Sequence, residues 1–91
     1  MNLSESQLNQ LEEYASKFLN ITEISILLDV DPDQLRESIS TRGTSEFKRY
    51  NTGKLNKILE LREQEIELAK LGSTVAIELV SKYMINQKND E

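Results

Sequence analysis

The chain has 91 residues and a net charge of −5 at neutral pH, and it contains neither cysteine nor histidine. The missing residue types exclude disulfides, thiolate or imidazole metal sites, and catalysis by a cysteine or histidine side chain. No apolar run approaches the roughly 20 residues of a membrane-spanning helix, and the first residues lack the basic and apolar regions of a signal peptide. We therefore expect one small domain, or one with an extension, that stays in the cytoplasm and has no membrane partner.

Apolar residues recur along the chain at spacings of three and four, and no sustained period-two pattern is present. The sequence therefore predicts an all-α fold of five helices, with the ranges 4–19, 21–28, 32–41, 45–70 and 74–86. Four of these helices have, at or just before their first residue, a side chain suited to cap the free amides of a helix start. These residues are Ser4, Asn20, Asp31 and Ser73. A glutamine or glutamate three residues later predicts a capping box at the first three of them.

The first three helices are expected to form a helix-turn-helix unit over residues 1–43. Their core-facing residues are expected to be Leu8, Leu11, Ala15, Phe18, Leu19, Ile21, Ile24, Leu27, Leu28, Leu35 and Ile39. A tight turn joins the second helix to the third, and Asp29 stands where such a turn usually has glycine. Aspartate tolerates the left-handed conformation, so the turn remains compatible with the motif. The alternative is an ordinary three-helix packing unit with no nucleic-acid role.

The stretch from Thr44 to Leu71 predicts one long helix, and its apolar residues spread over more than one face. Packing against one neighbouring helix would cover only a narrow apolar stripe. The wider apolar surface of this helix therefore indicates self-association. A bend is expected at Asn51–Gly53, because glycine weakens a helix by about 1 kcal/mol relative to alanine. The short link before Ser73 predicts an antiparallel helical hairpin over residues 44–87, followed by a polar tail at 88–91. The expected oligomerisation residues are Leu55, Ile58, Leu59, Ile66, Leu79 and Tyr83.

Charge is distributed unevenly along the chain. Residues 1–40 carry a net charge of −6, residues 41–57 carry +4, and residues 58–91 carry −3. A basic band of this kind is either a solvated helix face or a contact for an anion such as the phosphate backbone of double-stranded DNA. On the second interpretation, the third helix offers groove-facing side chains and the band offers backbone contacts. The candidate DNA-binding residues are Gln34, Arg36, Ser38, Thr41, Arg42, Lys48, Arg49 and Lys54.

The last third of the chain resembles a family of short tailed-phage proteins, the small terminase subunits or DNA-packaging proteins. In that pattern a long helix ends in alanine, lysine, any residue, glycine and a small polar residue, as in the run Ala69–Ser73. The next helix ends in a lysine that a glutamine follows five residues later, as Lys82 and Gln87 do here. The resemblance extends upstream through Tyr50, Gly53 and Lys54 and covers roughly residues 20–88. Relatives often carry tryptophan in place of Leu79 and glycine in place of Asn86.

The resemblance implies a non-catalytic protein of the bacterial host cytoplasm that binds phage DNA without a cofactor. Such proteins assemble into rings or other homo-oligomers through a helical hairpin and recruit the large terminase subunit, which carries the ATPase and nuclease. Two alternatives stay open: a helix-turn-helix transcriptional regulator with a dimeric hairpin, and a structural or connector oligomer of the phage that binds only protein. An enzyme is not favoured, because the glutamates of the long helix have no histidine beside them and no glycine-rich phosphate loop is present.

Overall fold

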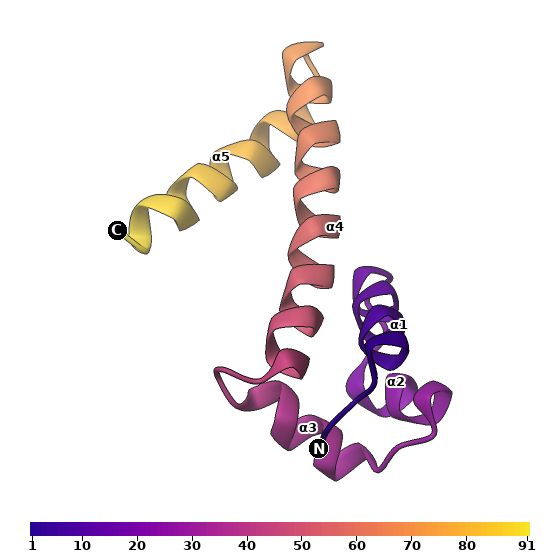
Figure 1. The fold of residues 1–91 in the computed structure, drawn as a ribbon. Coiled ribbons are helices and arrows are strands. Elements are labelled where there is room, and N and C mark those ends of the chain that lie inside the picture. The colour runs from indigo at the N-terminus through magenta and orange to yellow at the C-terminus, as the bar shows by residue number, and fades with distance from the viewer. The chain divides into compact units, whose positions relative to one another are not determined.

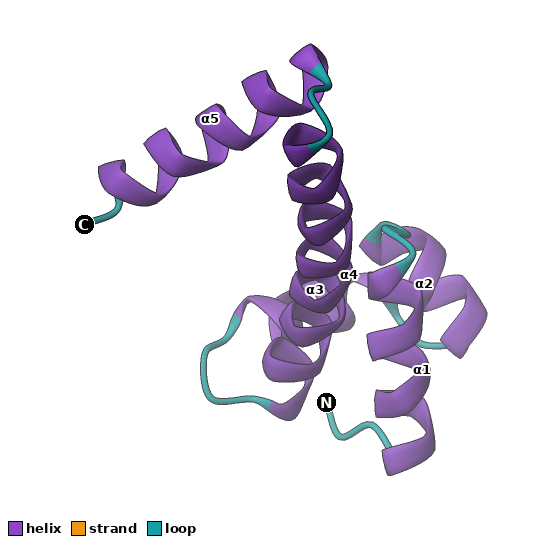
Figure 2. Ribbon diagram, turned by 90° about the horizontal axis from the view of Figure 1, so that it is seen from above, coloured by secondary structure: helices purple, strands orange, loops and turns teal.

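The computed structural model describes residues 1–91, and its regular structure is entirely helical (Figure 1). The helices are α1 (Glu5–Ser16), α2 (Ile21–Leu28), α3 (Pro32–Ser40), α4 (Ser45–Lys70) and α5 (Thr74–Asn89). Short loops join them, as Figure 2 shows. The predicted all-α class is therefore confirmed. The chain divides into two compact units, Met1–Lys57 and Ile58–Glu91, and the boundary between them lies inside α4.

The core of the N-terminal unit is built from one face of each of its first three helices. Leu11 of α1, Ile24 of α2 and Leu35 of α3 are fully buried, and Leu8, Leu28 and Ile39 complete the cluster. These residues repeat at helical spacing, so each helix presents one apolar line to the other two. Leu27 was expected in this core, but it is exposed because it lies nearly opposite Ser25 and about 100° around α2 from Leu28.

The N-terminal unit extends past residue 43, the expected end of the helix-turn-helix unit, because the first part of α4 packs on α1. Gly53 is buried at this contact, and a Cβ atom at that position would overlap the backbone carbonyl of Glu12. The glycine thus allows two helix backbones to approach closely. The bend expected at Asn51–Gly53 does not interrupt the helix, since α4 continues through these residues without a break.

Two of the three predicted capping boxes are confirmed. Ser4 accepts a hydrogen bond from the Gln7 amide at 3.2 Å and its own amide donates to the Gln7 side chain at 2.9 Å. Asn20 and Glu23 make the same reciprocal pair at 2.8 and 2.9 Å. The box expected at Asp31 is wrong, because the carboxylate accepts from the nearer amide of Asp33, at 3.4 Å.

The first helix ends at Ser16, earlier than residue 19, because Phe18 adopts a left-handed conformation with φ of 61°. The amide of Phe18 donates to the carbonyl of Ala15 at 3.0 Å, and the amide of Leu19 donates to the carbonyl of Tyr14 at 3.3 Å. This pair of bonds is the Schellman closure of a helix end. It turns the Phe18 side chain out of the core, and 52% of it is exposed.

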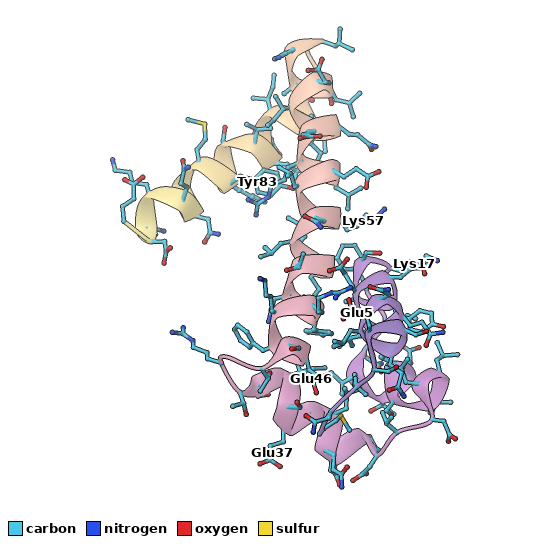
Figure 3. The ribbon with its side chains drawn as sticks, viewed as in Figure 1. Glu5, Lys17, Glu37, Glu46, Lys57 and Tyr83 are labelled. Carbon is cyan, nitrogen blue, oxygen red and sulfur yellow. The ribbon has the colours of Figure 1, made fainter.

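The C-terminal unit consists of the end of α4 and all of α5, which turns back from it (Figure 1). Ser73 caps α5 as expected, accepting from the amide of Ala76 at 3.3 Å. The helix continues to Asn89, so it takes in residues 87–89, which were expected to lie outside it. Tyr83 joins the two helices of this unit: its hydroxyl donates to Glu65, and the Arg62 guanidinium lies 4.4 Å from its ring centroid (Figure 3).

Candidate nucleic-acid interface and self-association surface

The outward face of α3 carries both acidic and basic side chains. Gln34, Arg36 and Thr41 are exposed as expected, whereas Ser38 is only 8% exposed and faces the core. Asp33 and Glu37 are exposed on the same helix. The Arg36 guanidinium lies 3.5 Å from the Asp33 carboxylate, so part of its charge is neutralised locally. An isolated α3 therefore presents little net attraction to phosphate.

Basic side chains emerge from the turn after α3 and from the first part of α4. Arg42 and Lys48 are exposed and form no ion pair. Lys54 is half-buried, with its ammonium 5.2 Å from the ring centroid of Tyr50. The only acid of this band, Glu46, is 4% exposed. The exposed cations Arg42 and Lys48 therefore have no exposed acid of the band beside them.

Hydrogen bonds fix the turn that carries Arg42. The Thr44 hydroxyl lies 2.7 Å from the carbonyl oxygen of Ser38 and 2.9 Å from that of Thr41, and it accepts from the amide of Phe47 at 3.0 Å. Gly43 has φ of 92°, a conformation that glycine adopts at little cost. The turn thus holds the end of α3 against the start of α4.

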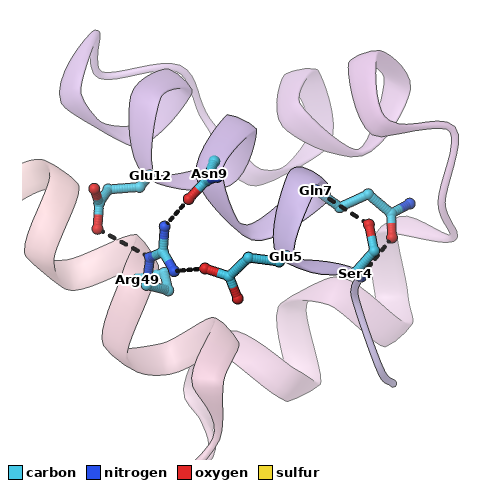
Figure 4. Close-up of polar contacts among 6 residues, drawn as sticks. All are labelled: Ser4, Glu5, Gln7, Asn9, Glu12 and Arg49. Carbon is cyan, nitrogen blue, oxygen red and sulfur yellow. Dashed lines mark hydrogen bonds and ion pairs between the residues drawn. The ribbon is translucent and has the colours of Figure 1, made fainter.

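Arg49 ties α4 to α1, as Figure 4 shows. Its Nε donates to Glu12 at 3.0 Å, its Nη1 donates to Glu5 at 2.9 Å, and Asn9 accepts a third bond. The hydrogen bond to Glu5 is the main cause that raises the pKa of Arg49 above its ordinary value. This side chain was expected to contact DNA; in the structure three of its five N–H donors bond within the unit.

One half of this ion-pair network is visible in the sequence, although it was not among the expected site residues. Glu5, Asn9 and Glu12 are spaced by four and three residues, so they form a polar line on one face of α1. This line contains two carboxylates and lies beside the apolar line of the same helix. It therefore indicates that a cationic side chain packs next to it. Nothing in that pattern identified the neighbour as Arg49, which is far along the chain.

The C-terminal unit leaves most of its apolar side chains exposed, and Ala76 is its only buried apolar residue. Among the residues expected to mediate self-association, Leu59 and Ile66 of this unit are exposed, whereas Ile58, Leu79 and Tyr83 are half-buried. Further exposed apolar residues of the unit are Leu61, Leu68, Leu71, Val75, Ile77, Met84 and Ile85. A large cluster of exposed apolar residues usually marks a site where another chain binds.

Tyr83 is the polar link of this unit. Its hydrogen bond to Glu65 is the largest cause that raises the pKa of the phenol above its ordinary value, and the nearby Arg62 opposes the shift. The ring also borders a cavity of about 490 Å³ that Arg62, Ile66 and Met84 help to line. The Nε atom of Arg62 is buried there without a hydrogen-bond partner.

No group of three or more acidic side chains is placed to hold a metal ion. None of the five helices combines the length and the apolar content needed to cross a membrane. Comparisons with protein-family models, with curated proteins and with solved structures found no match. The resemblance to small terminase subunits therefore stays a prediction from the sequence.

Proposed function

We propose that the chain is a non-catalytic DNA-binding adaptor for viral genome packaging, similar to a small terminase subunit. On this proposal α2 and α3 act as a helix-turn-helix, and the assembled protein recruits a large terminase subunit to double-stranded phage DNA. The observation that supports it most is the exposed basic pair Arg42 and Lys48, which has no ion-pair partner; Arg42 lies in the turn after α3 and Lys48 in the first turn of α4. Side chains in that position can contact the phosphate backbone and orient a recognition helix.

Several copies are needed for useful affinity on this proposal. The chain is acidic overall, with a net charge of −5, and Asp33 and Glu37 lie on the exposed face of α3. One copy therefore attracts phosphate weakly. Linked copies gain affinity through effective concentration without any new contact. The exposed apolar residues of the C-terminal unit supply a means of linking them, and closed symmetry is the usual result of such association.

Binding of a labelled DNA duplex, followed by fluorescence anisotropy over a range of salt concentrations, tests the proposal. Replacing Arg42 and Lys48 together with alanine should weaken binding by about tenfold or more at low salt. The slope of log affinity against log salt should fall by about 2 for each copy in contact with DNA if both side chains meet phosphate, and by about 1 if Arg42 alone does.

The matched control replaces Lys17 and Lys70 with alanine. It removes the same number of positive charges, but from side chains that pair with Glu13 and Glu67 outside the basic band. This control should leave the salt slope unchanged. If the Arg42 and Lys48 variant bound DNA as tightly as the parent chain, the basic band would be only a solvated face.

A further inference from the structure

The outer face of α2 is apolar and uncovered. Ile24 and Leu28 are buried on its inner side, whereas Ile26 is 73% exposed and Leu27 is 55% exposed on the other. Thr22 and Glu23 of the same helix are exposed and polar, so the apolar part of its outer face is confined to Ile26 and Leu27. Two exposed acids, Glu23 and Asp29, flank this outer face of α2. The surface is therefore an apolar ridge with an acidic border.

A groove of about 380 Å³ lies on the first part of α4. Its lining residues are Gly43, Thr44, Phe47, Lys48, Asn51, Thr52 and Leu55. Phe47 and Leu55 provide the apolar part, and Leu55 is 62% exposed. Lys48 is the only charged residue of the lining, and it is basic. The groove therefore has the opposite charge to the border of the α2 ridge.

The ridge and the groove lie on opposite sides of the N-terminal unit. Arg49 and Gly53 of α4 face α1, while Phe47 and Leu55 lie nearly half a helical turn away from them at about 100° per residue. Figures 1 and 2 both place α1 and α2 on one side of this part of α4 and the turn at 41–44 on the other. The two surfaces of one copy therefore cannot reach each other.

We propose that the outer face of α2 in one copy docks into the α4 groove of a second copy, head to tail. The ridge would insert Ile26 and Leu27 beside Phe47 and Leu55, with Glu23 and Asp29 close to Lys48. In such an assembly Lys48 would pair with these acids, and Arg42, which lies outside the groove, would supply the phosphate contact. Apolar contact and opposite charge then favour the same arrangement. A contact between two different surfaces continues from copy to copy, and it closes into a ring when the rotation allows. DNA does not suit this ridge, because its border repels phosphate.

The inference deepens the self-association part of the proposed function, and cysteine cross-linking tests it without DNA. The chain has no cysteine of its own, so any cross-link must form between the cysteines that are introduced. Ile26→Cys and Leu55→Cys replace exposed side chains, so both full-length variants should fold, as circular dichroism would verify. A disulfide requires the two Cα atoms to come within about 7 Å, and a short bis-maleimide reagent relaxes that demand. Products are read on a non-reducing gel.

An equal mixture of the two single variants should give a cross-linked dimer that contains one chain of each kind. It should form at least about tenfold faster than a mixture of Leu55→Cys with Gln10→Cys, a control at an exposed position of α1. A chain that carries both Ile26→Cys and Leu55→Cys should give a ladder of higher products.

Three outcomes would overturn the inference: Ile26→Cys alone cross-links as fast as the mixture, the mixture matches the Gln10→Cys control, or no cross-link forms. The first would indicate that two α2 faces meet each other. The head-to-tail contact can fail while the basic band still binds DNA, so this test is separate from that of the proposed function.

Discussion

Phe18, Asp29 and Gly72 occupy the same place in three helix ends. Each has a left-handed backbone conformation, with φ of 61°, 56° and 95° respectively. In each case the amide of the next residue bonds to the carbonyl five residues before it, which is the Schellman closure. Only Gly72 adopts this conformation without strain, since a side chain at positive φ crowds the following carbonyl oxygen. The other two positions therefore store a small amount of conformational energy.

We expect Asp29→Gly to raise the free energy of unfolding by about 0.5–1 kcal/mol, because it relieves the left-handed strain at an exposed position. Urea denaturation followed by circular dichroism measures this change. Asp33→Gly is the matched control, with the same loss of charge inside α3, and it should lower stability by about 1 kcal/mol. Equal effects of the two substitutions would show that backbone strain at Asp29 is not the cause.

The residues that could be predicted from the sequence are those whose partners lie nearby in the chain. Ser4 and Asn20 bond to residues three positions away, so their capping boxes follow from local spacing. The closure at Phe18 escaped prediction because an aromatic residue rarely occupies a left-handed position.

Contacts between distant elements were harder to anticipate. Gly53 was expected to bend α4, but its role depends on the close approach of α1, which no local pattern reveals. Arg49 was assigned to the candidate DNA site because it lies in the basic band, and only the fold brings it to Glu5 and Glu12. By contrast, the exposure of Arg42 and Lys48 agrees with the sequence pattern, because both stand away from the apolar lines.

At the scale of elements, Tyr83 links α5 to the end of α4 through Glu65 and Arg62. The pKa of Tyr83 is raised, so the folded state favours the neutral phenol. The stability that this link contributes is therefore fully present below the ordinary tyrosine pKa of about 10, and it is lost as pH rises through the folded-state pKa.

Alkaline titration of tyrosinate absorbance tests this link. Glu65→Gln should lower the midpoint at which Tyr83 ionises, because the hydrogen bond that the phenol donates to the Glu65 carboxylate is the main cause of the raised pKa. Tyr83→Phe identifies which part of the titration curve belongs to this residue. An unchanged midpoint in the Glu65→Gln variant would mean that Tyr83 and Glu65 do not bond in solution.

For the whole molecule, the proposed function combines two properties that sit in different units. The N-terminal unit carries the exposed basic pair and the candidate recognition helix, whereas the C-terminal unit carries most of the uncovered apolar residues. Neither property is sufficient alone for an adaptor, because one copy is acidic and an oligomer without basic residues would not bind phosphate. On this account a stable oligomer needs contacts of both units, so we expect assembly and DNA binding to be lost together when Leu59 and Ile66 are replaced by glutamate.

Native mass spectrometry of the full chain with a short DNA duplex tests this account most directly, because it counts protein copies and bound DNA in one measurement. The proposal predicts a closed oligomer of more than two copies that carries one duplex, and a Leu59→Glu, Ile66→Glu variant that is monomeric and free of DNA. A dimer on the duplex would instead support a helix-turn-helix regulator. A parent chain that is monomeric, or an oligomer that never carries DNA, would contradict the proposed function.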